Sequence, residues 1–391
     1  MHNPIYLDYN ATTPVDPQVA DVIEPYLRRY FFGNPSSNHI YGRRAHDAVE
    51  KAREQIAALI AAQHSEIIFT GCATEANNLA IRGAAEAMHS RGRHIITSAI
   101  EHPSVAAPFK LLKRNGWEVS VLPVDEFGIL SAESVSNALR TDTVLVSIMH
   151  ANNEVGSIQP ISEISDITRP KGILLHTDAA QTVGKIPVLV DRLGVDLLTL
   201  AGHKFYATKG VGALYVRKGT PIEPLLVGAG HEQDLRPGTE NVPAIVGIGK
   251  AAELIQQGNG FEGIALRALR DTLHERLLQA VPDLQLNGHP DMRLPNTLNV
   301  SFPNISGREL LEQAAGDIAA SVGSACHEES DAVSGVLGAM RISQQRARGA
   351  VRFSLGVPTT VLDVERAGNA LLSALCDCRL EAACYNPTRN N

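Results

Sequence analysis

The chain has 391 residues, of which 44% are hydrophobic and 20% charged, a composition that excludes collagen, coiled-coil and disordered proteins. Its formal charge is −7 at pH 7, and runs of Lys or Arg are no longer than Arg28-Arg29, which argues against direct nucleic-acid binding. No segment approaches the ~18 apolar residues of a membrane span, and no signal peptide precedes the first strand. These features favour a cytoplasmic protein. A domain size of roughly 150 residues favours two domains.

The five cysteines are too few and too clustered for a disulfide framework, which indicates a reducing compartment. Cys376, Cys378 and Cys384 lie close together, but structural zinc sites usually have four ligands, so we expect no metal. Cys72 and Cys326 lie among small residues, where the backbone can turn sharply and expose a thiol.

The first half of the chain alternates helical and strand patterns. Apolar residues recur with helical spacing at 22–27 and 45–62. Strands this apolar, separated by helices, predict an α/β fold with a mostly parallel sheet flanked by helices, which binds ligands at the carboxyl ends of its strands. The expected strands are 67–69, 94–97, 119–122, 144–148, 173–175, 197–200 and 213–216.

The pattern changes near residue 243, where a long helix with apolar residues from 264 to 277 replaces the alternation. The later segments predict a smaller α+β domain. We therefore divide the chain into a large domain, residues 15–250, and a small domain formed by residues 1–14 and 251–391. The expected strands of the small domain are 297–302, 318–321 and 351–355, and its further helices are about 309–313 and 362–375.

Two ionisable residues follow strands of the large domain. Lys204 lies in a Gly-containing turn after the strand at 197–200, a position typical either of a Schiff-base lysine or of a solvated surface lysine. Asp178 follows the strand at 173–175 among small residues that let a planar ligand approach. It either faces the pyridinium nitrogen of a pyridoxal phosphate or caps a helix that starts at Ala179.

Polar residues also follow the other parallel strands. Residues 71–78 pass from a strand into a helix through small residues, and Thr74 there fits either a phosphate cradle or an ordinary helix cap. His102 follows the next strand, where an imidazole can stack on a planar ring and shuttle protons. Asn153 follows the strand that ends near Met149. Polar residues among small ones at so many strand ends favour a binding site over coincidence.

With these residues placed, the chain resembles the cysteine desulfurases, fold-type I pyridoxal phosphate enzymes of the class V aminotransferase group that also includes selenocysteine lyases. Each matching motif is short, but their order along nearly the whole chain makes the resemblance specific. The motifs lie at residues 6–14, 33–37, 73–75, 101–102, 152–154, 178–181, 202–204, 236–241, 323–326 and 352–356.

The resemblance implies that the large domain binds pyridoxal 5'-phosphate and that Lys204 holds it covalently. Asp178 would pair with the ring nitrogen, and Gln181 would reach the ring hydroxyl. His102 would stack on the ring, and Asn153 would contact both cofactor and substrate.

The phosphate and the substrate carboxylate have their own implied partners. Backbone and hydroxyl groups of Ala73 and Thr74 would hold the phosphate with His203, and Thr239 would reach it from the partner subunit. The resemblance therefore implies an obligate homodimer. Arg352 would bind the substrate carboxylate, because a planar guanidinium matches it in a way that Lys cannot.

Two positions depart from the family pattern. Ala201 stands where many relatives have a phosphate-binding Ser, so one hydroxyl contact is missing. Cys72 stands where many have Gly, beside the expected phosphate cradle, and we interpret it as a small packing residue.

The implied reaction converts L-cysteine to L-alanine. Lys204 removes the Cα proton, and Cys326 of the small domain attacks the substrate sulphur as a thiolate and becomes a persulphide. A thiol with a pKa near ~8.5 needs help from His102 or from the field of the site. The acidic residues 327–331 fit either a mobile loop that carries the persulphide or a solvated turn. The unidentified acceptor protein would serve iron–sulphur cluster assembly or another sulphur-donor pathway.

Two alternatives stay open. Residues 321–327 and 236–241 look more like those of selenocysteine lyases and some dedicated sulphur donors, so L-selenocysteine is an alternative substrate. The fold could also serve as a cofactor-binding scaffold or accessory subunit, which requires Lys204 or Cys326 to be idle.

Overall fold

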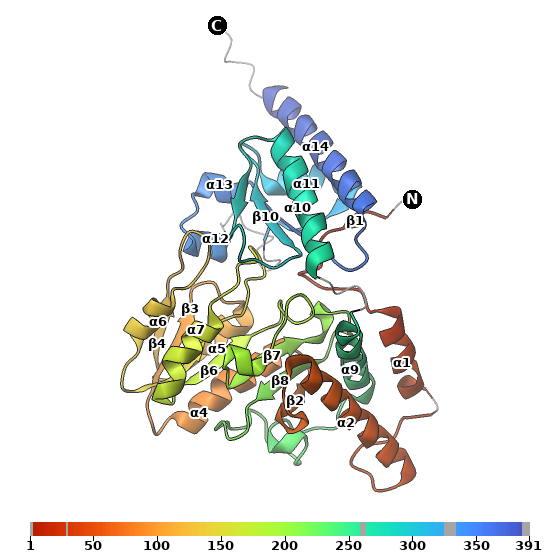
Figure 1. Cartoon of the computed structure of the whole chain (residues 1–391), viewed down its shortest axis with the longest axis vertical. Coiled ribbons are helices and arrows are strands. Elements are labelled where there is room, and N and C mark those ends of the chain that lie inside the picture. Colours follow the sequence, from red (N-terminus) through yellow and green to blue (C-terminus); the bar gives the residue numbers. More distant parts are fainter. Residues whose placement is uncertain (1–2, 29, 259–262, 324–333, 385–391) are drawn as a thin grey trace.

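The computed structural model describes residues 3–28, 30–258, 263–323 and 334–384. The protein has two lobes, and the larger one contains the main sheet (Figure 1). The smaller lobe combines β1, near the start of the chain, with the elements that follow α9. Among the described residues, no helix is long and apolar enough to cross a membrane.

A seven-stranded sheet forms the centre of the larger lobe, in the order β2-β8-β7-β6-β5-β3-β4. Neighbouring strands from β4 to β7 pair in parallel, whereas β8 runs antiparallel to β7 and β2. The predicted α/β class and mostly parallel sheet are therefore confirmed. The strands are β2 (Ile67–Thr70), β3 (His94–Ser98), β4 (Glu118–Leu122), β5 (Thr143–Ser147), β6 (Leu174–Asp178), β7 (Leu197–Ala201) and β8 (Gly212–Val216).

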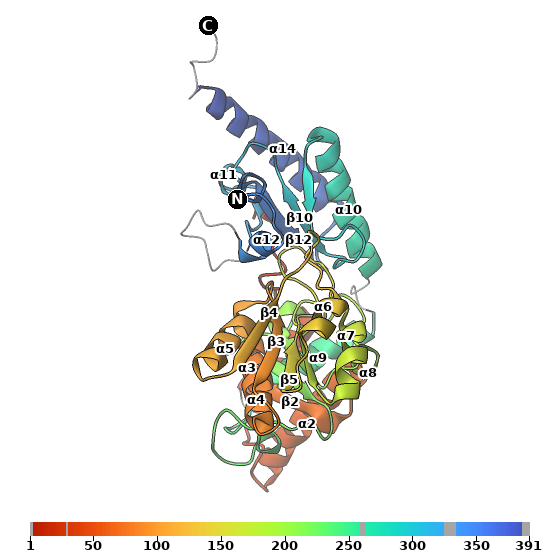
Figure 2. The same cartoon turned by 90° about the vertical axis from the view of Figure 1, so that its left-hand side faces the viewer.

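Helices cover both faces of this sheet, because successive residues of a strand point to opposite sides. Ile68 packs with helices α3 to α5, whereas its neighbour Phe69 belongs to the cluster that includes α2 and α9. Figure 2 shows α3, α4 and α5 on one side of the strands and α7, α8 and α9 on the other. The helices are α1 (Pro17–Leu27), α2 (Ile40–Ile60), α3 (Ala73–Asn78), α4 (Ala84–Met88), α5 (Pro103–Arg114), α6 (Ala132–Ala138), α7 (Ile161–Thr168), α8 (Val190–Leu193) and α9 (Val242–Gln256).

The first two helices begin earlier than predicted. Asp16 caps α1 by accepting a hydrogen bond from Gln18 N at 2.8 Å, and Pro17 occupies the first turn. His39 caps α2 in the same way. Apolar spacing identified the buried faces of these helices but missed their exposed first turns.

The smaller lobe contains a three-stranded antiparallel sheet, β12-β10-β9, and a short parallel pair, β1-β11. Its hydrophobic cluster joins Ile5 and Leu7 to Leu273 of α10 and Leu371 of α14. The strand expected at 318–321 has only two residues, and β9 was missed. The elements are β1 (Ile5–Tyr6), α10 (Gly263–Ala280), β9 (Gln285–Asn287), β10 (Thr297–Ser301), α11 (Gly307–Gln313), β11 (Ile318–Ala319), α12 (Gly335–Ala339), α13 (Gln344–Arg348), β12 (Ala350–Ser354) and α14 (Val361–Cys384).

The segment after β1 crosses from the smaller lobe to the larger one. Leu7 N donates to Ala319 O at 2.8 Å, and Thr13 N donates to His203 O at 3.0 Å. Asn10 lies between these two anchors. The crossing segment therefore lies against the carboxyl end of β7, at the edge where a parallel sheet binds its ligands.

Candidate active site

A cavity of about 300 Å³ opens at the carboxyl ends of the strands. It brings together the predicted residues from β2, β3, β5, β6 and β7 with Arg352 of the smaller lobe. The predicted residues that line it are Ala73, Thr74, His102, Asn153, Asp178, Gln181, His203, Lys204 and Arg352.

Two predicted residues are not placed in this cavity. Thr239 is exposed and does not line the cavity of its own chain. Cys326 and the segment 327–331 lie outside the described residues. In the part of the chain that the structure describes, no group of three or more His, Cys, Asp or Glu side chains is arranged to hold a metal ion.

Lys204 ends a short 3₁₀ turn, η4 (Gly202–Lys204), directly after β7. Its Nζ donates to Asn10 O at 2.6 Å and to Ala11 O at 2.8 Å, so the crossing segment orients the amine. Burial, together with the positive charge of Arg352, lowers the pKa of Lys204 to about 8. A lysine with so low a pKa yields a neutral, nucleophilic amine near physiological pH, unlike a solvated surface lysine.

Asp178 is the last residue of β6 and is buried. Its Oδ2 accepts a hydrogen bond from Asn77 Nδ2 at 2.7 Å, and its Oδ1 accepts one from Ala180 N at 2.9 Å. A turn follows Asp178 rather than the helix considered at Ala179. The carboxylate is thus held rigidly at the strand end, where its charge faces the cavity.

His102 is linked to Asp178 through two further side chains. Asn77 Nδ2 also donates to Ser104 Oγ at 2.9 Å, and Ser104 Oγ lies 2.8 Å from His102 Nδ1. Ser104 N donates to the same Nδ1, which caps α5 and makes this nitrogen an acceptor. Desolvation lowers the pKa of His102, so the neutral imidazole is favoured.

The N-terminus of α3 forms one wall of the cavity. Cys72 is its N-cap residue and makes no side-chain capping bond. Cys72 is exposed at the cavity wall and is not the packing residue we expected, because it precedes the first helical turn. Nearby, burial and the charge of Lys204 lower the pKa of His203 to about 4, which leaves its imidazole neutral. These groups suit a phosphate.

Arg352 of β12 is 3% exposed and is not a surface ion pair. Its Nη2 lies 2.6 Å from Asp8 Oδ1, and its Nη1 donates to Asn153 O at 3.1 Å. Its buried Nε has no partner. Two of the five guanidinium N–H groups are used by these contacts, so the group is fixed at the cavity wall with N–H groups still available to a carboxylate.

Asn10, Asn77 and Ser104 are parts of the site that the sequence interpretation missed. Asn10 provides its carbonyl oxygen to Lys204 and Gln181, and its side chain donates to Thr297 Oγ1 at 2.9 Å. Asn10 lies in the motif at 6–14 and Asn77 in the strand-to-helix segment at 71–78, and both side chains are buried. Their partners lie far away in the chain, so only the folded structure reveals them.

Comparison with known proteins identifies the family. The model described as aminotransferase class-V matches residues 5–367. Cysteine desulfurase IscS of Dictyoglomus turgidum is 48% identical over 93% of this chain and 92% of its own length. Cysteine desulfurase IscS 1 of Archaeoglobus fulgidus is 44% identical over 92% of this chain and 94% of its own.

Solved structures agree with these relatives. A NifS-like protein has a TM-score of 0.89 and 39% identity, covering 95% of this chain and 99% of that one. SspA in complex with cysteine has a TM-score of 0.78 and 38% identity, covering 90% of this chain and 98% of that one. The chain therefore belongs to the aminotransferase class-V family and, within it, to the cysteine desulfurases.

Proposed function

We propose that this protein is a pyridoxal 5'-phosphate-dependent cysteine desulfurase that converts L-cysteine to L-alanine and passes the sulphur to an acceptor. The observation that carries the proposal is that Lys204, Asp178 and Arg352 line one cavity of about 300 Å³. An amine, a carboxylate and a guanidinium match the aldehyde, the ring nitrogen and the substrate carboxylate of this chemistry.

The walls of the cavity fit the cofactor. The uncapped end of α3, with the Thr74 hydroxyl and the neutral His203, offers hydrogen-bond donors to the phosphate. His102 offers a flat ring, and Gln181 an amide for the ring hydroxyl. When bound, pyridoxal 5'-phosphate supplies an electron sink that makes the substrate Cα proton removable.

Lys204 anchors the cofactor and moves the Cα proton at its Nζ. The pKa of about 8 makes the neutral amine available near physiological pH. Asp178 keeps a proton on the ring nitrogen, because its negative charge stabilises the protonated form. Asn77 and Ala180 hold that carboxylate in place.

Arg352 and Asn153 bind the substrate carboxylate, and Cys326 accepts the sulphur. The Cys326 thiolate forms a bond to the substrate sulphur, and the bond from that sulphur to Cβ breaks. The products are alanine and a persulphide on Cys326. Ser321, which lies shortly before Cys326 in the chain, pairs with the backbone of Arg352 in both directions, which supports delivery of Cys326 toward the bound substrate.

We extend the proposal to a homodimer in which Thr239 reaches the phosphate of the partner's cofactor. Thr239 is exposed in the single chain, as an interface residue must be. Leu226 and Val227, which like Thr239 precede α9 in the chain, are 57% and 98% exposed, and two adjacent apolar side chains this exposed favour a partner surface.

The roles of the two lobes complete the proposal. The large domain, residues 15–250, binds the cofactor, and the small domain, residues 1–14 and 251–391, carries Cys326. Cys72 and Cys376 form no disulfide, which supports a reducing, cytoplasmic compartment. The acceptor is a protein of iron–sulphur cluster assembly or of another sulphur-donor pathway.

Alanine and sulphide or selenide release from L-cysteine and L-selenocysteine, measured side by side with the cofactor spectrum, tests the function. We expect a visible absorption band that shifts on adding L-cysteine, followed by alanine formation. A protein that released alanine only from L-selenocysteine would instead be a selenocysteine lyase. A band that did not respond to either amino acid would indicate a binding scaffold.

A further inference from the structure

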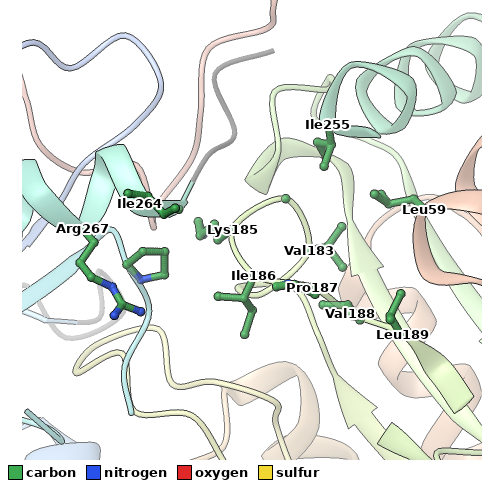
Figure 3. A pocket seen from close by; sticks show the side chains of 13 residues that line it. Leu59, Val183, Lys185, Ile186, Pro187, Val188, Leu189, Ile255, Ile264 and Arg267 are labelled. Atoms are coloured by element: carbon green, nitrogen blue, oxygen red, sulfur yellow. The ribbon is translucent and has the colours of Figure 1, made fainter. Parts of the chain in front are cut away.

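Lys185 lies between the candidate active site and a second cavity. This second cavity has a volume of about 720 Å³ and is lined mainly by apolar side chains. Figure 3 shows Lys185 at its wall, with Ile264 and Arg267 of α10 nearby. Lys185 does not line the active-site cavity itself. Any effect of Lys185 on the cofactor must therefore pass through a neighbouring residue or through its charge.

The neighbour that connects Lys185 to the active site is Gln181. Lys185 Nζ lies 2.9 Å from Gln181 Oε1, and Gln181 Nε2 donates to Asn10 O at 3.0 Å. An ammonium or amine N–H donates and a backbone carbonyl accepts, so these two contacts place the amide oxygen of Gln181 toward Lys185 and its nitrogen toward Asn10. The same Asn10 oxygen accepts from Lys204 Nζ at 2.6 Å. Gln181 is thus held at both ends.

This arrangement leaves one N–H of Gln181 for the cavity. The amide nitrogen has two hydrogens, and Asn10 O takes one of them. Gln181 Oε1 accepts from Lys185, and a flipped amide would place its oxygen against the Asn10 carbonyl oxygen, which has no hydrogen to donate, so the contact to Asn10 would be lost. Burial, with the charges of Lys204 and Arg352, lowers the pKa of Lys185 to about 7. A neutral amine still has N–H groups to donate, so the contact persists on both sides of that pH.

We infer that Lys185 is a positioning residue that fixes the Gln181 amide with its N–H₂ group toward the ring oxygen of the cofactor. The inference rests on the proposed function, in which Gln181 reaches that ring hydroxyl. A donor stabilises the ionised ring oxygen, whereas the oxygen end of a flipped amide would repel it. Lys185 thereby sets the charge state of the ring oxygen without touching the cofactor.

The test is a double-mutant cycle on the full-length holoenzyme, made of wild type, Lys185→Met, Gln181→Met and the double variant. Two quantities are measured: the dissociation constant for pyridoxal 5'-phosphate and the midpoint of its pH-dependent visible absorption. We expect Lys185→Met to raise the dissociation constant about fivefold, the loss typical of one hydrogen bond. The midpoint should move to higher pH, because a ring oxygen without a donor holds its proton more firmly.

The Gln181→Met background separates positioning from charge. If Lys185 acts through Gln181, adding Lys185→Met to Gln181→Met changes neither quantity further. If Lys185→Met shifts the absorption midpoint equally in the wild-type and Gln181→Met backgrounds, Lys185 acts through its charge alone, and the inference is overturned. An unchanged midpoint in the Lys185→Met single variant also overturns it.

Arg267→Met is the matched control, because it removes another cation of the second cavity that does not line the active site. Its spectrum and dissociation constant should match those of the wild type. If Lys185→Met fails to fold, Lys185→Arg is measured instead, because it keeps an N–H donor. We expect the folded Lys185→Arg variant to keep the wild-type midpoint of the pH-dependent absorption. A shifted midpoint would overturn the inference. Failure of the proposed function is distinct: the wild type would then bind no cofactor or release no alanine from L-cysteine.

Discussion

At the residue scale, the chemistry of Asp178 depends on Asn77, which is fully buried within α3. One Asn77 nitrogen serves both Asp178 and Ser104, while its Oδ1 has no partner. A buried amide that leaves its oxygen unsatisfied must be stabilised by its donor contacts. We therefore infer that the main role of Asn77 is to donate a hydrogen bond to the Asp178 carboxylate, rather than to pack the helix.

Asn77→Leu should reduce kcat for L-cysteine about tenfold, because the loss of a hydrogen bond to a charged group costs about 1.5 kcal/mol. Leu has a similar volume, so the packing of α3 should be largely kept. Asn78→Leu is the control, since Asn78 donates only to the backbone of its own helix at Thr74. Steady-state alanine release and thermal unfolding of both variants make the measurement. Equal kcat values for the two variants would contradict the assignment.

Lys204→Ala should abolish both the cofactor's visible band and alanine release, with activity at least about a thousandfold below wild type, because no other group replaces the nucleophile and base. Borohydride reduction followed by peptide mapping locates the lysine that carries the cofactor. Lys209→Ala, an exposed lysine of the same loop, should retain the band. Trapping at any lysine other than Lys204 would refute the role proposed for it.

At the element scale, a buried ion pair fixes the segment that leads to Thr239. Arg53 of α2 makes two 2.8 Å hydrogen bonds to the carboxylate of Glu232, and Phe69 N of β2 donates to the same carboxylate at 2.7 Å. Glu232 lies in the turn η5 (Glu232–Asp234), whose three residues have positive φ. The ion pair holds this unusual backbone against the sheet.

Glu232→Gln should lower the free energy of unfolding by about 3 kcal/mol, because it removes the buried countercharge of Arg53 and leaves only the more exposed Glu50. Glu50→Gln is the matched control: Glu50 pairs with the same arginine but its side chain is 37% exposed. Its loss should cost less than about 1 kcal/mol. Urea unfolding of both variants gives the comparison, and similar losses would show that burial does not set the strength of this pair.

The elements also show what sequence patterns can predict. The seven strands of the main sheet could be located because each contains a short stretch rich in apolar residues, and the positions at their carboxyl ends pointed to Lys204 and Asp178. The strand expected at 318–321 was located, but it is only two residues long, and its pairing with β1 could not be predicted because it joins opposite ends of the chain. The roles of Asn10 and Lys185 were missed because they also depend on contacts between distant parts of the chain. Their roles depend on partners that only the fold brings close.

At the scale of the whole molecule, the candidate site depends on both lobes. The crossing segment after β1 is tied to the smaller lobe through Leu7 and to the larger lobe through Thr13, and it orients Lys204 between these anchors. Arg352 reaches the cavity from β12 of the smaller lobe. A movement between the lobes would therefore change the distance between the substrate-binding arginine and the cofactor-binding lysine.

The homodimer proposal predicts complementation between two inactive variants. In Lys204→Ala, each site lacks its lysine, and in Thr239→Glu, a carboxylate should repel the phosphate. If Thr239 serves the partner's site, a mixed dimer contains one fully native site, with Lys204 from one chain and Thr239 from the other. Random reassembly of equal amounts should then restore about a quarter of wild-type activity, because half of the dimers are mixed and each has one active site of two.

Alanine release is measured before and after the two variants are unfolded together and refolded, with size-exclusion chromatography to confirm the dimer. Each variant refolded alone is the control and should stay inactive. If Thr239 served its own chain, each site of the mixed dimer would still carry one defect, so no activity would return. A mixture that forms dimers yet remains inactive would therefore exclude a shared site. Only a shared site would combine the native Lys204 of one chain with the native Thr239 of the other in a mixed dimer.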